Sequence, residues 1–394
     1  MAGWYDVIGI GKTGMKKIHY QTQFDNESKR TLFLIYLVSS SMRILSLLTR
    51  FAMTHIQFQQ GPIRPPSEAD SLLIRTTQGC PWNKCKFCTL FEGMEFAIRP
   101  AEDIKRDIWA AKAFYKNRQF ESCFLQDGDS FAMETDDLLD VLNTLKEAFP
   151  ELKQISSYGR AQTMTKKSPD EMKAICDAGL NMLYCGMESG SLEVLKLMKK
   201  GVTPKSILKS AQYAKQAGMK MMTFIILGLG GKSLSEHHVV QTAQLLNQIN
   251  PDEIRILSLA VKPDTELDDM VQNGQFTPLT EREMLEEQYQ LLSQLDGINS
   301  NYGNYHGINL LMELNGQLPH DKEVFLRTID QFMMMNENDQ NNFILGRRTH
   351  HYATLNDMNN KLMYDTVQQQ LRRIEQQKLG DLEDIFYSLR QRMI

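Results

Sequence analysis

The sequence contains no uninterrupted run of about 18 apolar residues, the length that a membrane-spanning helix requires. The nearest candidate, residues 32–38, is followed by three serines and ends before Arg43. A persuasive secretory signal is also lacking, so we expect a cytoplasmic protein without a membrane partner. No sign of charge dominates, because 44 basic and 48 acidic residues give a formal net charge of −4. Nothing in this balance draws the whole molecule to nucleic acid or to an anionic membrane.

Cysteine is also scarce, with six residues in 394, and three of the six crowd into positions 80–88. The other three, Cys123, Cys176 and Cys185, are far apart in the sequence. A crowded trio in a large chain without a secretory signal favours a metal site in a reducing compartment over a disulfide framework. Because no second cysteine cluster follows, we expect no auxiliary metal cluster.

The N-terminal stretch, residues 1–52, fits the rest of the chain poorly. Its Gly-rich segment at residues 9–14 has the spacing of a dinucleotide fingerprint, but neither a clear helix nor a second strand follows. We therefore predict that 1–52 is a poorly ordered or misassigned extension and that Met53 is the natural start. We also see no cobalamin-type domain before residue 70.

From about residue 70 a β-rich run and a helical stretch alternate six times, up to about residue 265. This alternation predicts parallel strands with helical crossovers. Six units are fewer than the eight of a closed TIM barrel. The fold class is therefore α/β, a partial (β/α)6 TIM-like barrel over residues 53–265. Residues 266–394 are expected to form a mainly helical extension that carries substrate or lid contacts, with His306 and Asn309 as candidates.

The sharpest feature is the loop that holds Cys80, Cys85 and Cys88, directly after the first predicted strand. Thiolates separated by four and two residues can converge on one soft metal centre. A structural zinc site wants four ligands, and no fourth His or Cys lies nearby in the sequence. A cubane iron–sulfur cluster with three cysteines leaves one iron open for a substrate or cofactor. A non-catalytic zinc or iron–sulfur module remains the alternative.

This loop resembles the cluster loop of the radical S-adenosylmethionine (SAM) superfamily, and Phe87 fills the aromatic position before the last cysteine. The first gap, of four residues, is one longer than the commonest form in that family. The resemblance implies that Cys80, Cys85 and Cys88 bind a 4Fe-4S cluster and that Phe87 borders the SAM site. It further implies reductive cleavage of SAM to a 5′-deoxyadenosyl radical, which takes hydrogen from an unknown substrate. The electron would come from a donor such as flavodoxin or ferredoxin, and nucleic acid enters only as a possible substrate.

Two further segments follow predicted strands and match that family's SAM contacts. Asp127-Gly128-Asp129 resembles the acidic Gly-rich motif that receives the SAM ammonium group, which implicates Gly128 and Asp129. The same residues also suit a plain turn or a helix N-terminus. Arg160 is placed to clamp a carboxylate, although a structural salt bridge is an equal interpretation.

The fourth and fifth strands end in two more such segments. Glu188, within Gly-Met-Glu-Ser-Gly, resembles a residue that accepts ribose hydroxyls or the SAM ammonium group, and Lys199-Lys200-Gly201 downstream matches the same subfamilies. Ile226 and Gly228 belong to a segment that resembles the one packing against adenine. A functional strand end is the preferred interpretation of both, with a purely structural turn as the alternative.

Overall fold

The computed structural model describes residues 58–378 and 380–393. The predicted extension 1–52, its Gly-rich segment and Met53 lie outside the described residues. Eight strands of the described chain form one sheet, in the same order as in the sequence. They are β1 (Leu72–Arg75), β4 (Ser122–Gln126), β5 (Gln154–Tyr158), β6 (Leu180–Glu188), β7 (Lys220–Leu227), β8 (Glu253–Ser258), β9 (Asn301–Gly303) and β10 (Gly316–Gln317).

Within this eight-stranded sheet, neighbouring strands pair in parallel from β1 through β9, and β10 runs antiparallel to β9. Because each strand is added beside the previous one, the sheet winds in one direction, as in a barrel. The predicted partial α/β barrel is therefore confirmed, and β9 and β10 extend it beyond the six predicted strands. A separate two-stranded ribbon, β2 (Thr77–Gln78) and β3 (Ala97–Ile98), flanks the cysteine loop.

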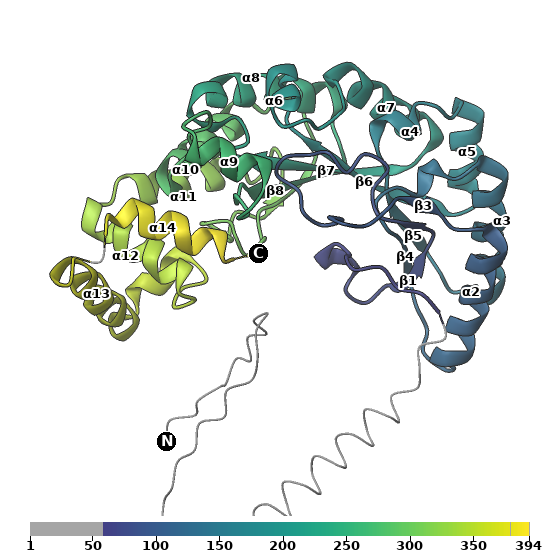
Figure 1. Ribbon diagram of the computed structural model, residues 1–394, viewed down its shortest axis with the longest axis horizontal. Helices are drawn as coiled ribbons and strands as arrows, with labels where there is room; N and C mark the ends of the chain where they lie inside the picture. Colours follow the sequence, from purple (N-terminus) through teal and green to yellow (C-terminus); the bar gives the residue numbers. More distant parts are fainter. Residues whose placement is uncertain (1–57, 379, 394) are drawn as a thin grey trace, which may run out of the picture. The chain divides into compact units, whose positions relative to one another are not determined.

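Helices of the barrel lie on the outer side of the strands, as Figure 1 shows for α2, α3, α5, α7 and α8. They are α2 (Ala101–Tyr115), α3 (Thr135–Ala148), α4 (Ala161–Met164), α5 (Pro169–Asp177), α6 (Leu192–Leu197), α7 (Pro204–Ala217) and α8 (Gly231–Ile249). Local signals define their ends: Ser168 and Glu171 form the capping box that opens α5, and Gly218 ends α7 in the left-handed conformation.

The mainly helical C-terminal part is also as predicted. Its helices are α9 (Glu266–Gln272), α10 (Glu281–Gln294), α11 (Lys322–Met333), α12 (Glu337–Arg348), α13 (Lys361–Gln376) and α14 (Leu382–Gln391). Short 3-10 helices are η1 (Pro66–Glu68), η2 (Ser130–Ala132) and η3 (Leu355–Asn359). None of the helices in the described ranges combines the length and the apolar character that crossing a bilayer requires.

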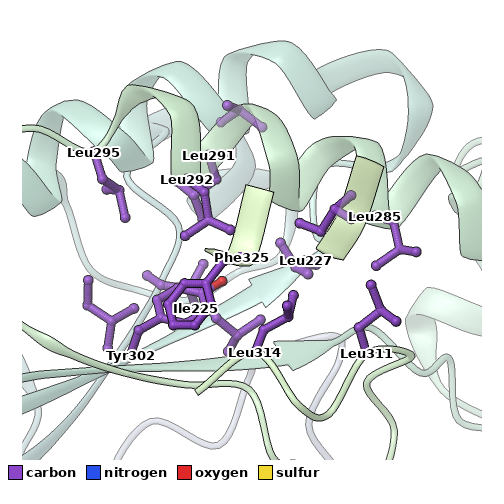
Figure 2. Packing of buried hydrophobic residues seen from close by; sticks show 14 of the residues in the cluster. Ile225, Leu227, Leu285, Leu291, Leu292, Leu295, Tyr302, Leu311, Leu314 and Phe325 are labelled. Atoms are coloured by element: carbon purple, nitrogen blue, oxygen red, sulfur yellow. The ribbon is translucent and has the colours of Figure 1, made fainter. Parts of the chain in front are cut away.

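One hydrophobic core joins the barrel to this C-terminal part. Ile225 and Leu227 of β7 belong to the same buried cluster as leucines of α10 and Phe325 of α11. Figure 2 shows the α10 side chains above the β7 residues, with Leu311 and Leu314 from the segment between β9 and β10 beside them. Burial of this shared apolar surface attaches the helical part to the barrel.

The structure differs from the predicted element bounds at β6. The sequence predicts a strand over residues 182–185, whereas β6 continues to Glu188. A bulge between Gly186 and Glu188 shifts the register against β7, and Glu188 has φ +62°. The bulge turns the strand end locally. Glu188 is therefore the last residue of a strand rather than part of the loop after it.

Candidate active site

A cavity of about 370 Å³ lies at the carboxyl ends of the barrel strands. Its walls include Tyr158 from β5, Glu188 from β6, Ile226 from β7 and Ser258 from β8. Ligand sites of barrels and of open parallel sheets lie at this edge, because loops that follow successive strands meet there. This cavity is therefore the candidate active site.

Most of the residues that the sequence singled out meet in this cavity. Those that line it are Cys80, Cys85, Phe87, Cys88, Gly128, Arg160, Glu188 and Ile226. Asp129 and Gly228 are not among the residues of its wall.

Asp129 instead points into the protein. Its side chain is fully buried, and Thr163 donates a hydrogen bond of 2.6 Å to its Oδ2 atom. Burial raises the pKa of Asp129 to about 7. Its Oδ1 atom has no hydrogen-bond partner among the described residues. Asp129 therefore makes its hydrogen bond within the protein and does not line the cavity.

Asp127, which the sequence analysis treated only as part of the acidic motif, holds the start of the cysteine loop. Its Oδ2 atom accepts a hydrogen bond from Arg75 at 2.7 Å and one from the Gly79 backbone N–H at 3.0 Å. Gly128 allows the close approach, because a Cβ atom there would lie 2.8 Å from the Gly79 carbonyl oxygen and 3.2 Å from the Cys80 Cα. The acidic motif thus has a structural task beside any contact with a ligand.

The turn at residues 198–201 holds the middle of the cysteine loop. The indole N–H of Trp82 donates to the Lys199 carbonyl at 2.6 Å, and the Lys86 N–H donates to the Met198 carbonyl at 3.1 Å. Gly201 has φ +70°, and a Cβ atom there would lie 2.3 Å from the Trp82 ring. Only glycine fits this position without moving the ring. This packing explains why a glycine stands at position 201.

The cysteines have the chemistry of a cluster site. None of the three forms a disulfide, and all are partly buried. Burial raises the pKa of Cys85 to about 11 and also raises the pKa of Cys88. The guanidinium group of Arg160 lies 3.9 Å from the Cys80 sulfur. Three such thiols at one cavity fit an iron–sulfur cluster as ligands.

Within the described ranges, no three His, Cys, Asp or Glu side chains are grouped closely enough to hold one metal ion. A cubane cluster does not require such a group, because each cysteine binds a different iron atom.

Glu188 and Lys200 form an ion pair on the cavity wall. Lys200 Nζ lies 2.7 Å from Glu188 Oε1, and the two side chains are 13% and 10% exposed. Burial alone would lower the pKa of Lys200, but the Glu188 carboxylate and Cys85 raise it above its usual value. The Lys200 ammonium also lies 5.8 Å from the centre of the Phe87 ring. The pair therefore links the end of β6 to the cysteine loop.

An aromatic wall inside the barrel was missed by the sequence analysis. Tyr158, Tyr184 and Phe224 line the cavity, with ring centres 6.0–6.4 Å apart. Each comes from a different strand, so no local motif marks them. The inward alternation of residues in β5, β6 and β7 is the signal from which they could have been found.

The C-terminal part adds His306 to the cavity wall. Burial lowers the pKa of His306, and the nearby Arg255 charge lowers it further. Asn309 is buried and accepts a hydrogen bond from Ser258 at 3.0 Å, so it supports the wall. Ser258 and Lys262, which the sequence analysis did not select, also line the cavity.

Comparison with known proteins gives matches in sequence and matches in structure. An uncharacterised methyltransferase of Pyrococcus horikoshii is 24% identical over 197 residues, which cover 50% of this chain and 40% of that protein. A tRNA uridine(34) acetyltransferase of Methanocaldococcus infernus is 28% identical over 120 residues, or 30% of this chain and 22% of that protein. Each match spans less than half the length of these relatives. The solved coproporphyrinogen III oxidase of Escherichia coli has a TM-score of 0.45 at 17% identity, covering 57% of this chain and 52% of that chain.

The family model of the Radical SAM superfamily matches residues 74–246. The matched region starts in β1 and ends in α8, so it contains the cysteine loop and most of the strand ends that border the cavity. Enzymes of this family bind a 4Fe-4S cluster and SAM. The chain therefore carries a radical SAM domain at residues 74–246 and is an enzyme.

Proposed function

We propose that Cys80, Cys85 and Cys88 ligate the 4Fe-4S cluster and that SAM and the substrate share the cavity beside it. The observation that carries this proposal is the arrangement of the cavity wall. Three free thiols of one loop line the same cavity as the Arg160 cation and the Glu188–Lys200 pair. When bound there, the cluster would supply the electron for cleavage of SAM to methionine and a 5′-deoxyadenosyl radical, the species that takes hydrogen from a substrate.

The side chains of the wall suit the charges of SAM. Arg160 is placed to pair with its carboxylate, and Glu188 to accept hydrogen bonds from its ribose hydroxyls or ammonium group. Ile226 offers an apolar edge to the adenine ring, and Phe87 borders the site from the cysteine loop. Gly128 lines the same cavity beside Cys80 and offers its backbone to SAM. These roles are proposals for the residues of the wall.

We propose that the substrate lies against Tyr158, Tyr184 and Phe224, the part of the wall that no SAM contact uses. The aromatic surface of these three side chains excludes water from the reacting atoms. His306 and Lys262 provide polar groups at the C-terminal side of the same cavity. His306 belongs to residues 266–394, and its place on the wall supports a role for that part in substrate recognition. The names of the two relatives describe different reactions, so they do not select a substrate.

The proposal also needs a one-electron donor, for which flavodoxin or ferredoxin are the expected types. In the laboratory dithionite replaces it. The protein is reconstituted anaerobically with iron and sulfide, reduced in the presence of SAM, and assayed for 5′-deoxyadenosine. Wild type is expected to form this product.

The matched variants are Cys85→Ala and Cys176→Ala. Cys85→Ala is expected to lose the cluster and the product, because only two thiol ligands remain. Cys176 is a half-buried cysteine outside the loop, so Cys176→Ala is expected to behave as wild type. Stoichiometric zinc without cluster or product in the wild type would refute the proposal and support a structural metal module.

A further inference from the structure

Two buried polar residues on helices α8 and α10 lie close to the proposed SAM site but outside its wall. His238 belongs to α8 and Glu287 to α10, and their side chains are each 1% exposed. Neither residue lines the cavity. Both contact the turns that end the strands of the proposed site.

Glu287 holds the turn after β7. Its carboxylate accepts hydrogen bonds from the Gly228 backbone N–H and from the Ser235 hydroxyl. Gly228 has φ +78°, and it lies between Leu227, the last residue of β7, and the start of α8. The carboxylate thus joins the strand end that carries Ile226 to the first turns of the next helix.

His238 holds the turn after β6. Its Nδ1 atom lies 2.8 Å from the Ser189 hydroxyl, and Thr242, one helical turn further along α8, accepts the Gly190 N–H at 2.8 Å. A Cβ atom at Gly190 would lie 2.2 Å from the Gln241 carbonyl oxygen, so this turn packs directly on α8. The residue before Ser189 is Glu188, whose positive φ is unfavourable for a side chain larger than glycine. Contacts of this kind keep Glu188 in its position.

The side chains of His238 and Glu287 are neighbours. His238 Nε2 lies 3.8 Å from Glu287 Oε1, beyond hydrogen-bonding distance, and has no hydrogen-bond partner among the described residues. Burial lowers the pKa of His238 to about 4 and raises the pKa of Glu287 to about 7. Burying such groups costs free energy that apolar side chains of similar size would avoid.

We propose that His238 and Glu287 are positioning residues for SAM, which act through the turns at Ser189 and Gly228. This inference rests on the proposed function, because it assumes that Glu188 and Ile226 contact SAM. Glu287 fixes the backbone beside Ile226, and His238 fixes the residue after Glu188. Together they set the distance between the ends of β6 and β7, which are proposed to contact the nucleoside part of SAM.

The test compares Glu287→Leu with Glu287→Gln in the full-length, anaerobically reconstituted protein. Leucine removes the acceptor for the Gly228 N–H, whereas glutamine keeps one. A buried N–H group left without an acceptor costs about 1–3 kcal/mol. We therefore expect Glu287→Leu to raise the Kd for SAM about tenfold or more and Glu287→Gln to stay within about threefold, since tenfold corresponds to about 1.4 kcal/mol. Exposed Glu286 on the same helix gives the control, Glu286→Leu.

Three readouts separate positioning from a structural role: iron content, melting temperature and SAM binding by equilibrium dialysis. A positioning role predicts weaker SAM binding with unchanged iron content at a temperature well below the melting temperature of each variant. A lower melting temperature with an unchanged Kd would overturn the inference.

A milder change, Ser189→Ala, tests the His238 contact if Glu287→Leu does not fold. We expect it to raise the Kd for SAM several-fold, and an unchanged Kd would count against the inference. Failure of the proposed function is recognised separately, in the wild type. A wild-type protein that assembles a cluster but binds no SAM refutes both, whereas equal binding by wild type and Glu287→Leu refutes the positioning role alone.

Discussion

Asp127 is predicted to determine whether the cysteine loop can hold a cluster. Its Oδ2 atom accepts three hydrogen bonds, from Arg75 Nη2 at 2.7 Å, from Arg75 Nε at 3.2 Å and from the Gly79 N–H at 3.0 Å. The Asp127 side chain is fully buried, and that of Arg75 is 13% exposed. Gly79 directly precedes Cys80, so the carboxylate acts one residue away from the first proposed cluster ligand.

The expected cost depends on what replaces the carboxylate. Asp127→Ala leaves the Arg75 charge buried without its partner, and losing one member of a buried ion pair costs about 3–5 kcal/mol. Asp127→Asn keeps an oxygen that can occupy the position of Oδ2 and loses only the charge. A neutral hydrogen bond is weaker than a charged one by about 1 kcal/mol, so we expect a loss of about 1–2 kcal/mol. Cluster assembly should follow the same order: wild type, then asparagine, then alanine.

Urea unfolding of the apo protein, followed by circular dichroism under anaerobic conditions, measures the stability difference. Iron and sulfide content after reconstitution measures cluster assembly. The control is Asp137→Ala, which removes an exposed carboxylate near the start of α3 and should change the free energy of unfolding by less than about 1 kcal/mol. A free energy of unfolding for Asp127→Ala within 1 kcal/mol of wild type, with full iron content, would refute the proposed task of Asp127.

Two further predictions concern Gly201 and Glu287. Gly201→Ala should destabilise the protein by about 2–4 kcal/mol, because a methyl group there meets the Trp82 ring as well as a positive φ. The control is Gly218, which has φ +84° but no atom within 4 Å of a Cβ built there, so Gly218→Ala should cost only about 1 kcal/mol. Equal losses of unfolding free energy for the two variants in urea would refute the Trp82 contact. Because burial raises the pKa of Glu287 to about 7, its stabilising contribution is full below pH 4.5 and is lost as the pH rises to 7. Glu287→Gln should therefore gain about 3 kcal/mol relative to wild type between pH 4.5 and pH 8 in apo-protein unfolding, and parallel pH profiles would contradict this.

The barrel was predictable because its signals are local. A β-rich run followed by an amphipathic helix, repeated along the chain, specifies parallel strands whatever the contacts between them. The rule that functional residues follow the strands then places Cys80, Arg160 and Glu188 at one edge. All three line one cavity in the structure.

The C-terminal part was less predictable because its elements depend on distant partners. The strand β9 has only three residues, too few to show an alternating pattern, and it forms by pairing with β8. The helix α12 is largely polar in sequence, yet Arg347 and Arg348 are buried in it. Arg348 pairs with Glu281 and Arg347 donates to backbone carbonyls, among them those of Leu310 and Asn309. Such contacts appear only after folding.

The acidic motif shows why the list of site residues was harder to predict than the fold. Asp127 and Asp129 flank one glycine, and the sequence analysis selected Asp129 as the SAM contact. In the structure the Gly128 backbone packs against Gly79 and Cys80, so Asp127 reaches the Gly79 N–H while Asp129 reaches Thr163. The position of the cysteine loop thus decides which carboxylate faces which neighbour. No spacing rule within the motif contains that information.

The same reasoning applies to the segment that ends at Gly201. Its resemblance to family subgroups suggested a link to SAM, and Lys200 does reach the cavity through Glu188. Its other contacts, from the Lys199 carbonyl to Trp82 and from Gly201 to the Trp82 ring, position the cysteine loop instead. The loop is therefore held from two sides, by Asp127 after β4 and by residues 198–201 after β6. A cluster loop without secondary structure of its own needs such external supports, because its three thiols must keep a fixed spacing while the cluster assembles. Residues that accompany the cysteines along this chain therefore include supports of the loop as well as the proposed contacts to SAM.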